Sequence, residues 1–246
     1  MDKQELQRQC DNYNSVIVES TDGIDCAICG NKQFIKIIEG EYAVVVECDC
    51  RQQHKNKQLI AKSNLGELFY TCTFDNFETK TEWQKSVKEL ALRYLKDGIE
   101  EKKWLFFGGQ VGSGKTHICT AIVAELMKRG KEAYYMLWRD EISRLKADVN
   151  SAEYQSAMAK LSNVTVLYID DFFKVKTLPT DADMQIMFQI INNRYIRRLT
   201  TIFSSELSVR RITELDEAMG SRINQMVGEY AVFIKPDTTK NMRNAQ

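Results

Sequence analysis

A glycine-rich stretch near the middle of the chain has the residue types that bind phosphate. GGQVGSGKTH places Gly109, Gly114, Lys115 and Thr116 at the spacing G-x-x-x-x-G-K-[ST], directly after the apolar run at 104–107. In such a loop backbone N–H groups point at phosphate oxygens, the lysine reaches the β and γ phosphates, and the hydroxyl can ligate Mg²⁺. The alternative is a glycine-rich loop without a ligand. We predict a site for ATP or ADP with Mg²⁺, formed by Gly109, Gly112, Ser113, Gly114, Lys115, Thr116 and His117.

A second apolar run ends in two carboxylates. Residues 164–169 (VTVLYI) have the composition of a buried strand and lead into Asp170 and Asp171. Because ligands of open α/β sheets bind at the carboxyl ends of the strands, Asp170 can hold Mg²⁺ with Thr116, and Asp171 can orient or deprotonate an attacking water. We therefore predict an ATPase in which Lys115, Asp170 and Asp171 are catalytic. The alternative is an acidic pair that merely ends a strand.

Four of the seven cysteines are closely spaced near the N-terminus. CAIC and CDC are separated by 18 residues that include two strand-like runs, a spacing close to that of zinc ribbons. Four thiolates satisfy tetrahedral Zn²⁺, so we predict a structural zinc site. Free thiols are the alternative, and His54 could replace one ligand. The predicted zinc ligands are Cys26, Cys29, Cys48 and Cys50, whereas Cys10, Cys72 and Cys119 have no partner in sequence and are interpreted as ordinary thiols.

Length and charge limit the classes of function. A chain of 246 residues can hold one nucleotide-binding domain and a small second module. The 34 basic and 34 acidic side chains balance, so any contact with nucleic acid must come from local patches, such as the cations of the helix expected at 51–62. No run has the ~18 apolar residues of a membrane span, and the N-terminus lacks the apolar core of a signal peptide. We expect a cytoplasmic protein without membrane contact.

The helices and strands that must position these residues are predicted from the apolar periodicity, and they indicate an α/β fold. Beyond the phosphate loop, helices and strands alternate, which is typical of a parallel sheet covered by helices. The strand AYYML at 133–137, between the two motifs, is interpreted as the insertion of an additional-strand P-loop ATPase. We predict a zinc-binding module at 1–63, a linker at 64–80 and an ATPase core at 81–246. The expected core strands are 104–107, 133–137, 164–169, 200–204 and 231–235, and the expected core helices are 83–95, 116–129, 139–149, 151–161, 181–198 and 208–227.

ATPases of this type also place a polar sensor at the end of the strand that follows the acidic one. Here that position falls on Ser204, Ser205 or Glu206. Two serines that close a strand are explained almost as well by turn chemistry. We predict that Ser205 contacts the nucleotide.

Together these stretches resemble one family: the AAA+ helicase loaders of the DnaC/DnaI type, including phage versions, and the similar IstB-type transposition ATPases. The resemblance covers CAIC…CDC, TFDNF, GGQVGSGKTH, VLYIDDF, IINNRY, TTIFSS and GSRI. Arg222 in GSRI matches the arginine finger that reaches a neighbour's γ-phosphate, although a helix-surface arginine is the alternative. Arg194 matches a family arginine whose role can be structural. Relatives commonly have asparagine where Glu206 stands, so the sensor departs from the family pattern and Ser205 could substitute.

The resemblance also implies partners. Loaders of this kind self-associate through their ATP sites, bind single-stranded DNA and place the replicative hexameric helicase on it. IstB-type ATPases instead act on duplex DNA with a transposase, and they generally lack the cysteine module, so CAIC…CDC favours the loader. A P-loop kinase and a non-catalytic adaptor that binds nucleotide only to stay folded are further alternatives.

Overall fold

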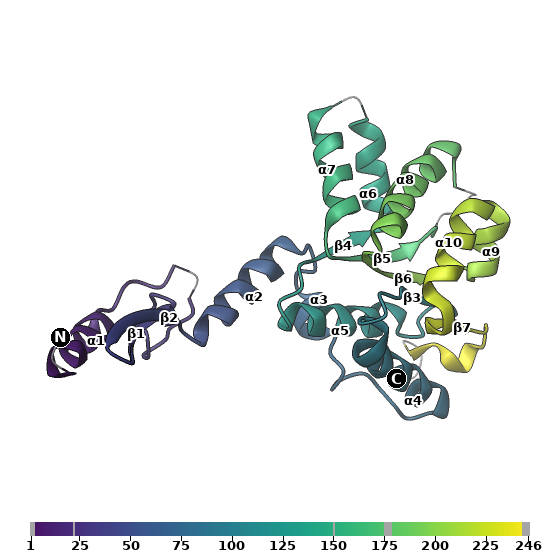
Figure 1. Cartoon of the computed structure of the whole chain (residues 1–246). Coiled ribbons are helices and arrows are strands. Elements are labelled where there is room, and N and C mark those ends of the chain that lie inside the picture. Colours follow the sequence, from purple (N-terminus) through teal and green to yellow (C-terminus); the bar gives the residue numbers. More distant parts are fainter. Residues whose placement is uncertain (1–2, 22, 150, 175–178, 243–246) are drawn as a thin grey trace. The chain divides into compact units, whose positions relative to one another are not determined.

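The computed structural model describes residues 3–21, 23–149, 151–174 and 179–242, and the chain divides into two units, residues 1–61 and 62–246. The first unit is built on a hairpin of β1 (Phe34–Glu39) and β2 (Tyr42–Glu47), which pair antiparallel over their full length. Helix α1 (Lys3–Ser15) packs on this hairpin (Figure 1). Asn14 exchanges two hydrogen bonds with the backbone of Lys36, at 2.9 and 2.8 Å, and so fixes the end of α1 on β1. Helix α2 (Cys50–Lys62) follows β2.

A five-stranded parallel sheet forms the second unit. The strand order is β4-β5-β6-β3-β7, and every neighbouring pair is parallel. Each strand except β7 is almost entirely buried, as expected for a sheet covered by helices on both faces. The strands are β3 (Leu105–Gly109), β4 (Ala133–Leu137), β5 (Val166–Phe172), β6 (Thr200–Ser205) and β7 (Ala231–Ile234).

The strand predicted at 133–137, between the two motifs, is present as β4. Strand β4 lies at the sheet edge beside β5, whereas β6 separates the phosphate-loop strand β3 from the acidic strand β5. The order of the strands along the chain does not give this order in the sheet. Parallel strands joined by helical crossovers need not be neighbours in the sheet.

Two groups of helices cover the faces of the sheet. Helix α5 contacts β3, β4, β5 and β6, and α3 and α4 pack on α5. Figure 1 shows α6, α7 and α8 on the opposite side of the sheet, where α6 contacts β4 and β5, and α8 contacts α6, α7 and α10. The helices are α3 (Leu68–Thr71), α4 (Glu82–Arg93), α5 (Lys115–Lys128), α6 (Trp138–Ala147), α7 (Ala152–Asn163), α8 (Asp181–Arg197), α9 (Val209–Leu215) and α10 (Glu217–Val227).

Two expected helices differ in their extent. The helix expected at 208–227 is broken at Asp216, whose backbone is extended and whose Oδ1 accepts a hydrogen bond at 2.7 Å from the N–H of Met219. This side chain caps α10, and such a cap favours a new helix over continuation of the old one. The helix expected at 83–95 ends at Arg93 and continues as a π-helical turn, Tyr94–Gly98.

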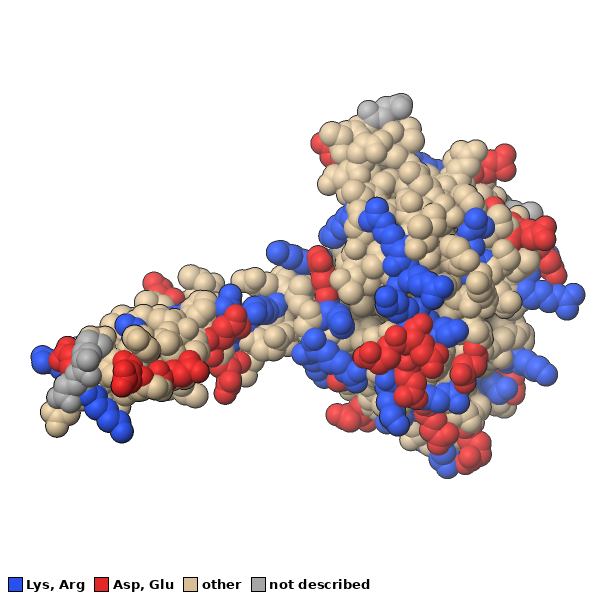
Figure 2. Space-filling view, in the orientation of Figure 1, with Lys and Arg blue, Asp and Glu red and all other residues tan. Residues whose placement is uncertain are grey.

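Charges of both signs are interspersed on the surface. Figure 2 shows small groups of Lys and Arg next to small groups of Asp and Glu on the visible face of residues 62–246. This agrees with the balanced totals of the sequence, so electrostatic attraction on this face is local. Among the described residues, no helix is long and apolar enough to cross a bilayer.

Candidate functional site

The loop between β3 and α5 is shaped by glycines with left-handed backbones. Gly109, Gly112 and Gly114 have φ values of +101°, +73° and +78°, which side chains with a Cβ rarely adopt. A Cβ on Gly109 would also lie 2.0 Å from the carbonyl oxygen of Ile234 in β7. Gly114 immediately precedes Lys115, the first residue of α5. The loop therefore leads into a helix N-terminus, where unpaired N–H groups and the helix dipole favour an anion.

Lys115 is the buried cation of this loop. Its Nζ donates to the carbonyl oxygens of Gly109 at 2.9 Å and Gln110 at 2.6 Å. Burial lowers the pKa of Lys115, while the charges of Glu206 and Asp171 act in the opposite direction. Phosphate oxygens are negatively charged, so they bind this ammonium more strongly than the two neutral carbonyl oxygens do.

Asp170 lies behind the loop and accepts hydrogen bonds from four hydroxyl groups. Its side chain is buried, with 3% of the residue exposed. Its Oδ1 accepts from Thr116 Oγ1 at 3.0 Å, from the Tyr168 hydroxyl at 2.7 Å and from Ser204 Oγ, and its Oδ2 accepts from the Tyr135 hydroxyl at 2.9 Å. Burial, and then the nearby Asp170 charge, raise the pKa of both phenols, which keeps them protonated as donors. The carboxylate is thus fixed beside Thr116.

Thr116 and Asp170 are the two residues predicted to hold Mg²⁺. Their side-chain oxygens are 3.0 Å apart, from α5 and from the strand β5. Hydroxyl and carboxylate oxygens are the hard ligands that Mg²⁺ prefers, usually together with water and phosphate oxygens. The residues present therefore fit this ion.

Asp171 follows in an irregular part of β5. Its φ is +52°, and the register between β5 and β6 shifts between Ile169 and Phe172. Its backbone N–H donates to Ser204 Oγ at 3.0 Å. In a regular strand two successive side chains point to opposite faces. The irregular backbone instead lets Asp171 line the same pocket as the phosphate loop, while Asp170 contacts Thr116.

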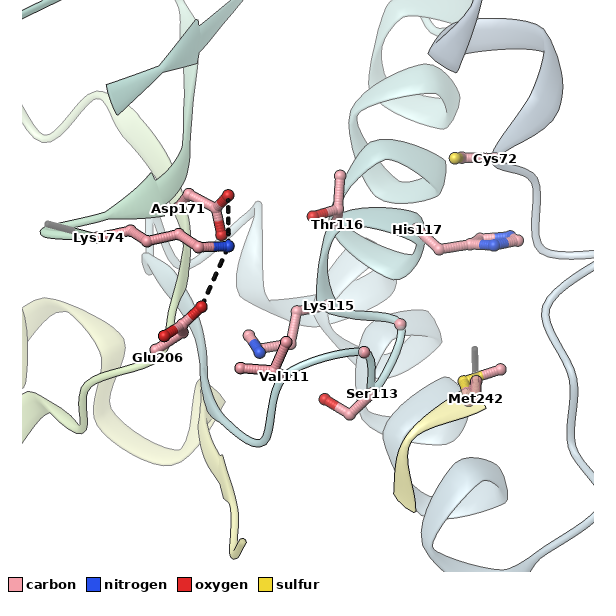
Figure 3. Close-up of a pocket in the computed structure, with 12 residues that line it drawn as sticks. Cys72, Val111, Ser113, Lys115, Thr116, His117, Asp171, Lys174, Glu206 and Met242 are labelled. Carbon is pink, nitrogen blue, oxygen red and sulfur yellow. Dashed lines mark hydrogen bonds and ion pairs between the residues drawn. The ribbon is translucent and has the colours of Figure 1, made fainter. Parts of the chain in front are cut away.

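These side chains border one pocket with a volume of about 430 Å³ (Figure 3). Of the predicted residues, Gly112, Ser113, Gly114, Lys115, Thr116, His117 and Asp171 line it. The structure does not bring Gly109, Asp170, Ser205 or Arg222 to the pocket wall. The wall also includes Glu206, one of the three candidate sensor positions, and four residues that were not predicted to bind nucleotide, namely Cys72, Val111, Lys174 and Met242.

The two serines at the end of β6 have different partners. Ser204 contacts the acidic pair as described above, whereas the Ser205 hydroxyl donates to the carbonyl oxygen of Phe172 at 2.7 Å and accepts from the N–H of Leu207 at 3.0 Å. Glu206 is the next residue and lines the pocket. The geometry therefore puts Ser204 and Glu206, not Ser205, nearest to the groups expected to act on nucleotide.

Segments from outside the two motifs close the pocket on the side of α5. His117 Nε2 lies 2.8 Å from the carbonyl oxygen of Thr73, and its ring packs edge-to-face against Phe77, both in the segment predicted as a linker. The N–H of Met242 donates to the carbonyl oxygen of Gly112 at 2.9 Å. Sequence reasoning missed Met242 because it carries no chemistry of its own; only tertiary structure brings it to the loop.

Arg222 belongs to helix α10, and its side chain packs on α8 rather than in the pocket of its own chain. Its Nε donates to Asn192 Oδ1 at 3.1 Å, and its NH1 donates to the carbonyl oxygen of Ala218 at 2.6 Å. The guanidinium also stacks over the rings of Phe188 and Tyr195, at 5.1 and 5.6 Å from their centroids. These contacts hold the side chain without burying it, so it remains partly open to solvent.

Arg194 is completely buried and binds backbone. It donates to Thr201 Oγ1 at 2.9 Å and to the carbonyl oxygens of Leu161, Val164 and Thr200 at 3.0, 2.8 and 2.5 Å. Burial lowers its pKa to about 9. Because these acceptors belong to the end of α7 and to β6, Arg194 has a structural role in this arrangement.

The four N-terminal cysteines form a cluster in the first unit. Their sulfur atoms lie within 4.8 Å of one another, with Cys26 to Cys48 at 3.8 Å and Cys29 to Cys50 at 3.5 Å. Tetrahedral Zn²⁺ with Zn–S bonds of about 2.3 Å would hold sulfurs about 3.8 Å apart. All four are free thiols, and among the described residues His54 does not join the cluster. The donor set and its spacing fit zinc.

Hydrogen bonding and burial shift the pKa values of these thiols in opposite directions. Hydrogen bonding from the backbone at Cys29 lowers the pKa of Cys26 to about 7. Burial raises the pKa of Cys48 and Cys50. A divalent cation would offset the cost of ionising such buried thiols.

The fold and the pocket define a P-loop nucleotide-binding protein of the AAA+ class. The family model described as "IstB-like ATP binding protein" matches residues 31–223, and the chain belongs to this family. The predicted resemblance to DnaC/DnaI-type loaders and IstB-type ATPases is confirmed by this match and by the relatives that follow. The AAA+ fold is likewise confirmed.

Three relatives and one solved structure illustrate the similarity. The phage-like element PBSX protein XkdC of Bacillus subtilis is 30% identical over 221 residues, covering 86% of this chain and 82% of its own length. Protein YqaM of the same organism is 35% identical over 201 residues, 78% of this chain but 64% of YqaM, so the chain spans less than two thirds of that relative. The replicative helicase loader DnaC of Buchnera aphidicola (Schizaphis graminum) is 26% identical over 174 residues, 69% of this chain and 68% of DnaC. A crystal structure of the DnaC helicase loader superposes with a TM-score of 0.57 at 24% identity, covering 68% of this chain and 97% of that one.

Proposed function

We propose that this protein is an ATP-dependent loader that binds the replicative hexameric helicase and single-stranded DNA and places the helicase on the DNA. The observation that carries the ATPase part is the hydrogen-bonded chain from Thr116 through Asp170 and Ser204 to the backbone of Asp171, beside the phosphate loop. The loading part is supported by relatives that are named replicative helicase loaders.

Different residues of the pocket bind the phosphates, hold the metal ion and act on the attacking water. Lys115 and the N–H groups of the loop bind the phosphates. Thr116 and Asp170 hold Mg²⁺, which when bound neutralises charge on the β and γ phosphates. Asp171 orients the attacking water or accepts its proton. Arg222 of a neighbouring subunit contacts the γ-phosphate, so that hydrolysis depends on self-association.

The cysteine module at 1–63 binds the helicase or another protein partner. Several of its apolar side chains are exposed, among them Ile17 at 79%, Ile28 at 64% and Tyr42 at 72%. Where exposed apolar side chains form one patch, they mark a protein contact surface, and these residues are the candidates for such a patch. Zinc held by the four cysteines would make this surface rigid, because a metal site supplies much of the folding free energy of such a unit.

A loading assay tests the proposal directly. The purified protein is mixed with candidate replicative helicases, and capture of a hexamer identifies the partner. Loading is then measured as helicase activity on protein-coated single-stranded circles with a forked duplex, with ATP and Mg²⁺. We expect loading with wild type and none with Lys115→Ala. Absence of capture and of stimulated unwinding with every helicase from the same genome would contradict the loader function.

A transposition ATPase is the second candidate, because the matching family model bears the IstB name. Such a protein would assemble with ATP on duplex DNA and act with a transposase. Binding of single-stranded and duplex oligonucleotides, compared at the same salt concentration, separates the two functions, since non-specific DNA affinity varies steeply with salt. Preference for duplex DNA together with capture of a transposase would favour this candidate.

A further inference from the structure

Lys174 bridges two carboxylates that reach the pocket from different strands. Its Nζ lies 3.1 Å from Asp171 Oδ2 and 3.1 Å from Glu206 Oε1. Asp171 belongs to β5, and Glu206 directly follows β6. Figure 3 shows the ammonium between the two carboxylates, across the pocket from Thr116 and above Lys115. Asp171 is the residue proposed to act on water, so Lys174 is bound to the proposed base.

A tight turn fixes the position of Lys174. Asp171 and Phe173 have φ values of +52° and +58°, and the N–H of Lys174 donates to the carbonyl oxygen of Asp171 at 2.9 Å. Phe173 is 3% exposed and packs edge-to-face on Trp138, with ring centroids 4.9 Å apart. Left-handed conformations of residues other than glycine cost free energy and persist only where the surroundings impose them. The turn and the packing of Phe173 therefore hold Lys174 at the pocket.

The two ion pairs are accessible enough to be exchanged. The side chains of Lys174, Asp171 and Glu206 are 45%, 30% and 36% exposed. Ion pairs at such positions are weak because water competes for both charges. A terminal phosphate carries more charge than a carboxylate and offers several acceptor oxygens, so it is the stronger partner for an ammonium in the same pocket.

We propose that Lys174 is a positioning residue that exchanges partners: it holds Asp171 and Glu206 together, and the γ-phosphate of ATP draws it away, which frees the Asp171 carboxylate for water. ADP lacks this phosphate and leaves the bridge in place. The proposal rests on the ATPase function proposed above. Lys174 would thereby make the pocket respond to ATP and not to ADP.

The exchange is tested by nucleotide binding rather than by turnover. Dissociation constants are measured for ADP and for an ATP analogue whose β and γ phosphates are joined by a methylene group, both with Mg²⁺. K174Q should weaken binding of the analogue about tenfold, the effect of one charge-assisted hydrogen bond, and change ADP binding less than twofold. K174R should restore most of the preference. The matched control is K85Q, which breaks an exposed pair between Lys85 and Glu82, 2.7 Å apart on α4, and should change neither constant.

A second variant distinguishes exchange from simple support of the pocket. E206Q removes a competitor for Lys174, so it should strengthen binding of the analogue, opposite in direction to K174Q. In the double variant K174Q/E206Q this gain should disappear, because there is no ammonium left to release. If K174Q weakens both nucleotides equally, or if E206Q weakens the analogue, Lys174 only supports the pocket and the exchange is wrong. If wild type binds neither nucleotide, the proposed ATPase function fails as well, whereas wild-type binding with an unchanged ATP-to-ADP preference in K174Q overturns the exchange alone.

Discussion

The hydroxyl oxygen of Ser204 accepts a hydrogen bond from the backbone N–H of Asp171 at 3.0 Å, and the same hydroxyl donates to the carboxylate of Asp170. One side chain from β6 thus links the two acidic residues of β5. A hydroxyl has one proton and two lone pairs, so Ser204 can make both bonds at once. It couples the residue proposed for the metal to the residue proposed for water.

Replacement of Ser204 by alanine should therefore impair hydrolysis more than binding. Ser204→Ala leaves the N–H of Asp171 without its partner and removes one donor from Asp170, which relaxes the positive-φ backbone at Asp171. We expect kcat to fall about ten- to a hundredfold, equivalent to about 1–3 kcal/mol, with the ATP dissociation constant changed less than threefold. Steady-state ATPase and equilibrium binding measurements check this. Ser143→Ala, on the exposed face of α6, is the control. Equal loss of binding and turnover would contradict the positioning role.

Substitution of Lys115 should mainly weaken ATP binding, whereas substitution of Asp171 should mainly slow ATP hydrolysis. Lys115→Ala removes the cation of the loop, so ATP binding should weaken at least about tenfold. Asp171→Asn keeps the shape of the side chain but cannot accept a proton, so binding should be retained while hydrolysis slows about 10²–10³-fold. Titration with a fluorescent ATP analogue and single-turnover hydrolysis are the measurements. Comparable loss of binding in both variants would show that the assigned roles are wrong.

Arg222 should act on the nucleotide of a neighbouring subunit. Because it belongs to α10, packs on α8 and lies outside the pocket of its own chain, Arg222→Ala should bind ATP almost as wild type does. Its stimulated hydrolysis should fall, by as much as about 10³–10⁵ where such an arginine is fully used. ATP-dependent self-association, measured by light scattering, should be lost with it.

Mixing variants gives the sharper form of this experiment. Arg222→Ala keeps an intact pocket, and Lys115→Ala keeps an intact Arg222, so a mixed interface can join the two. Recovery of hydrolysis in the mixture is the expected result. Unchanged hydrolysis by Arg222→Ala alone would show that this residue only joins α10 to α8.

The cysteine cluster should contain one Zn²⁺ per chain. Elemental analysis of the purified protein measures the ratio directly, and Cys29→Ser should lower it because Cys29 is a fully buried member of the cluster. Cys72→Ser, outside the cluster, should keep the full zinc content. Strong chelation should unfold residues 1–61, seen as loss of protected amides, while the second unit keeps its structure. A folded first unit that contains no metal would contradict the prediction.

Arg194 should be important for stability rather than catalysis. Arg194→Met removes four hydrogen bonds and leaves buried carbonyl groups without donors, so we expect the second unit to lose about 2–4 kcal/mol of stability. Urea denaturation measures this. Arg197→Met, one turn later in α8 and exposed, should change stability by less than about 0.5 kcal/mol. A similar small change for Arg194→Met would show that water or other groups replace its contacts.

Local spacing made the phosphate loop, the acidic pair and the cysteine cluster predictable. In each, residues close in sequence share one piece of backbone, so the pattern contains most of the geometry. The same is true of the alternation that predicted the parallel sheet. The order of the strands in the sheet was not predictable in this way, because the packing of the helical crossovers determines which strand lies beside β3.

The remaining pocket residues depend on contacts between distant segments. Lys174 reaches the site only because Asp171 and Phe173 adopt left-handed backbones, which the sequence FFK does not signal. Tyr135 and Tyr168 read as ordinary strand residues, although their hydroxyls meet at Asp170. Ser204 and Ser205 look alike in sequence, and the pairing of β5 with β6 decides which of them faces the acidic pair.

Tyr135 has two separate attachments. Its backbone N–H donates to the carbonyl oxygen of Ser63 at 2.7 Å, and its own carbonyl oxygen accepts from Asn64 Nδ2 at 3.3 Å, so the segment that enters the second unit is tied to the outer edge of β4. Its phenol meanwhile reaches Asp170. Tyr135→Phe would therefore remove the hydrogen bond from the phenol to Asp170 and keep the two backbone hydrogen bonds to Ser63 and Asn64. At this position the pocket can thus be changed without changing how the entering segment is attached to β4.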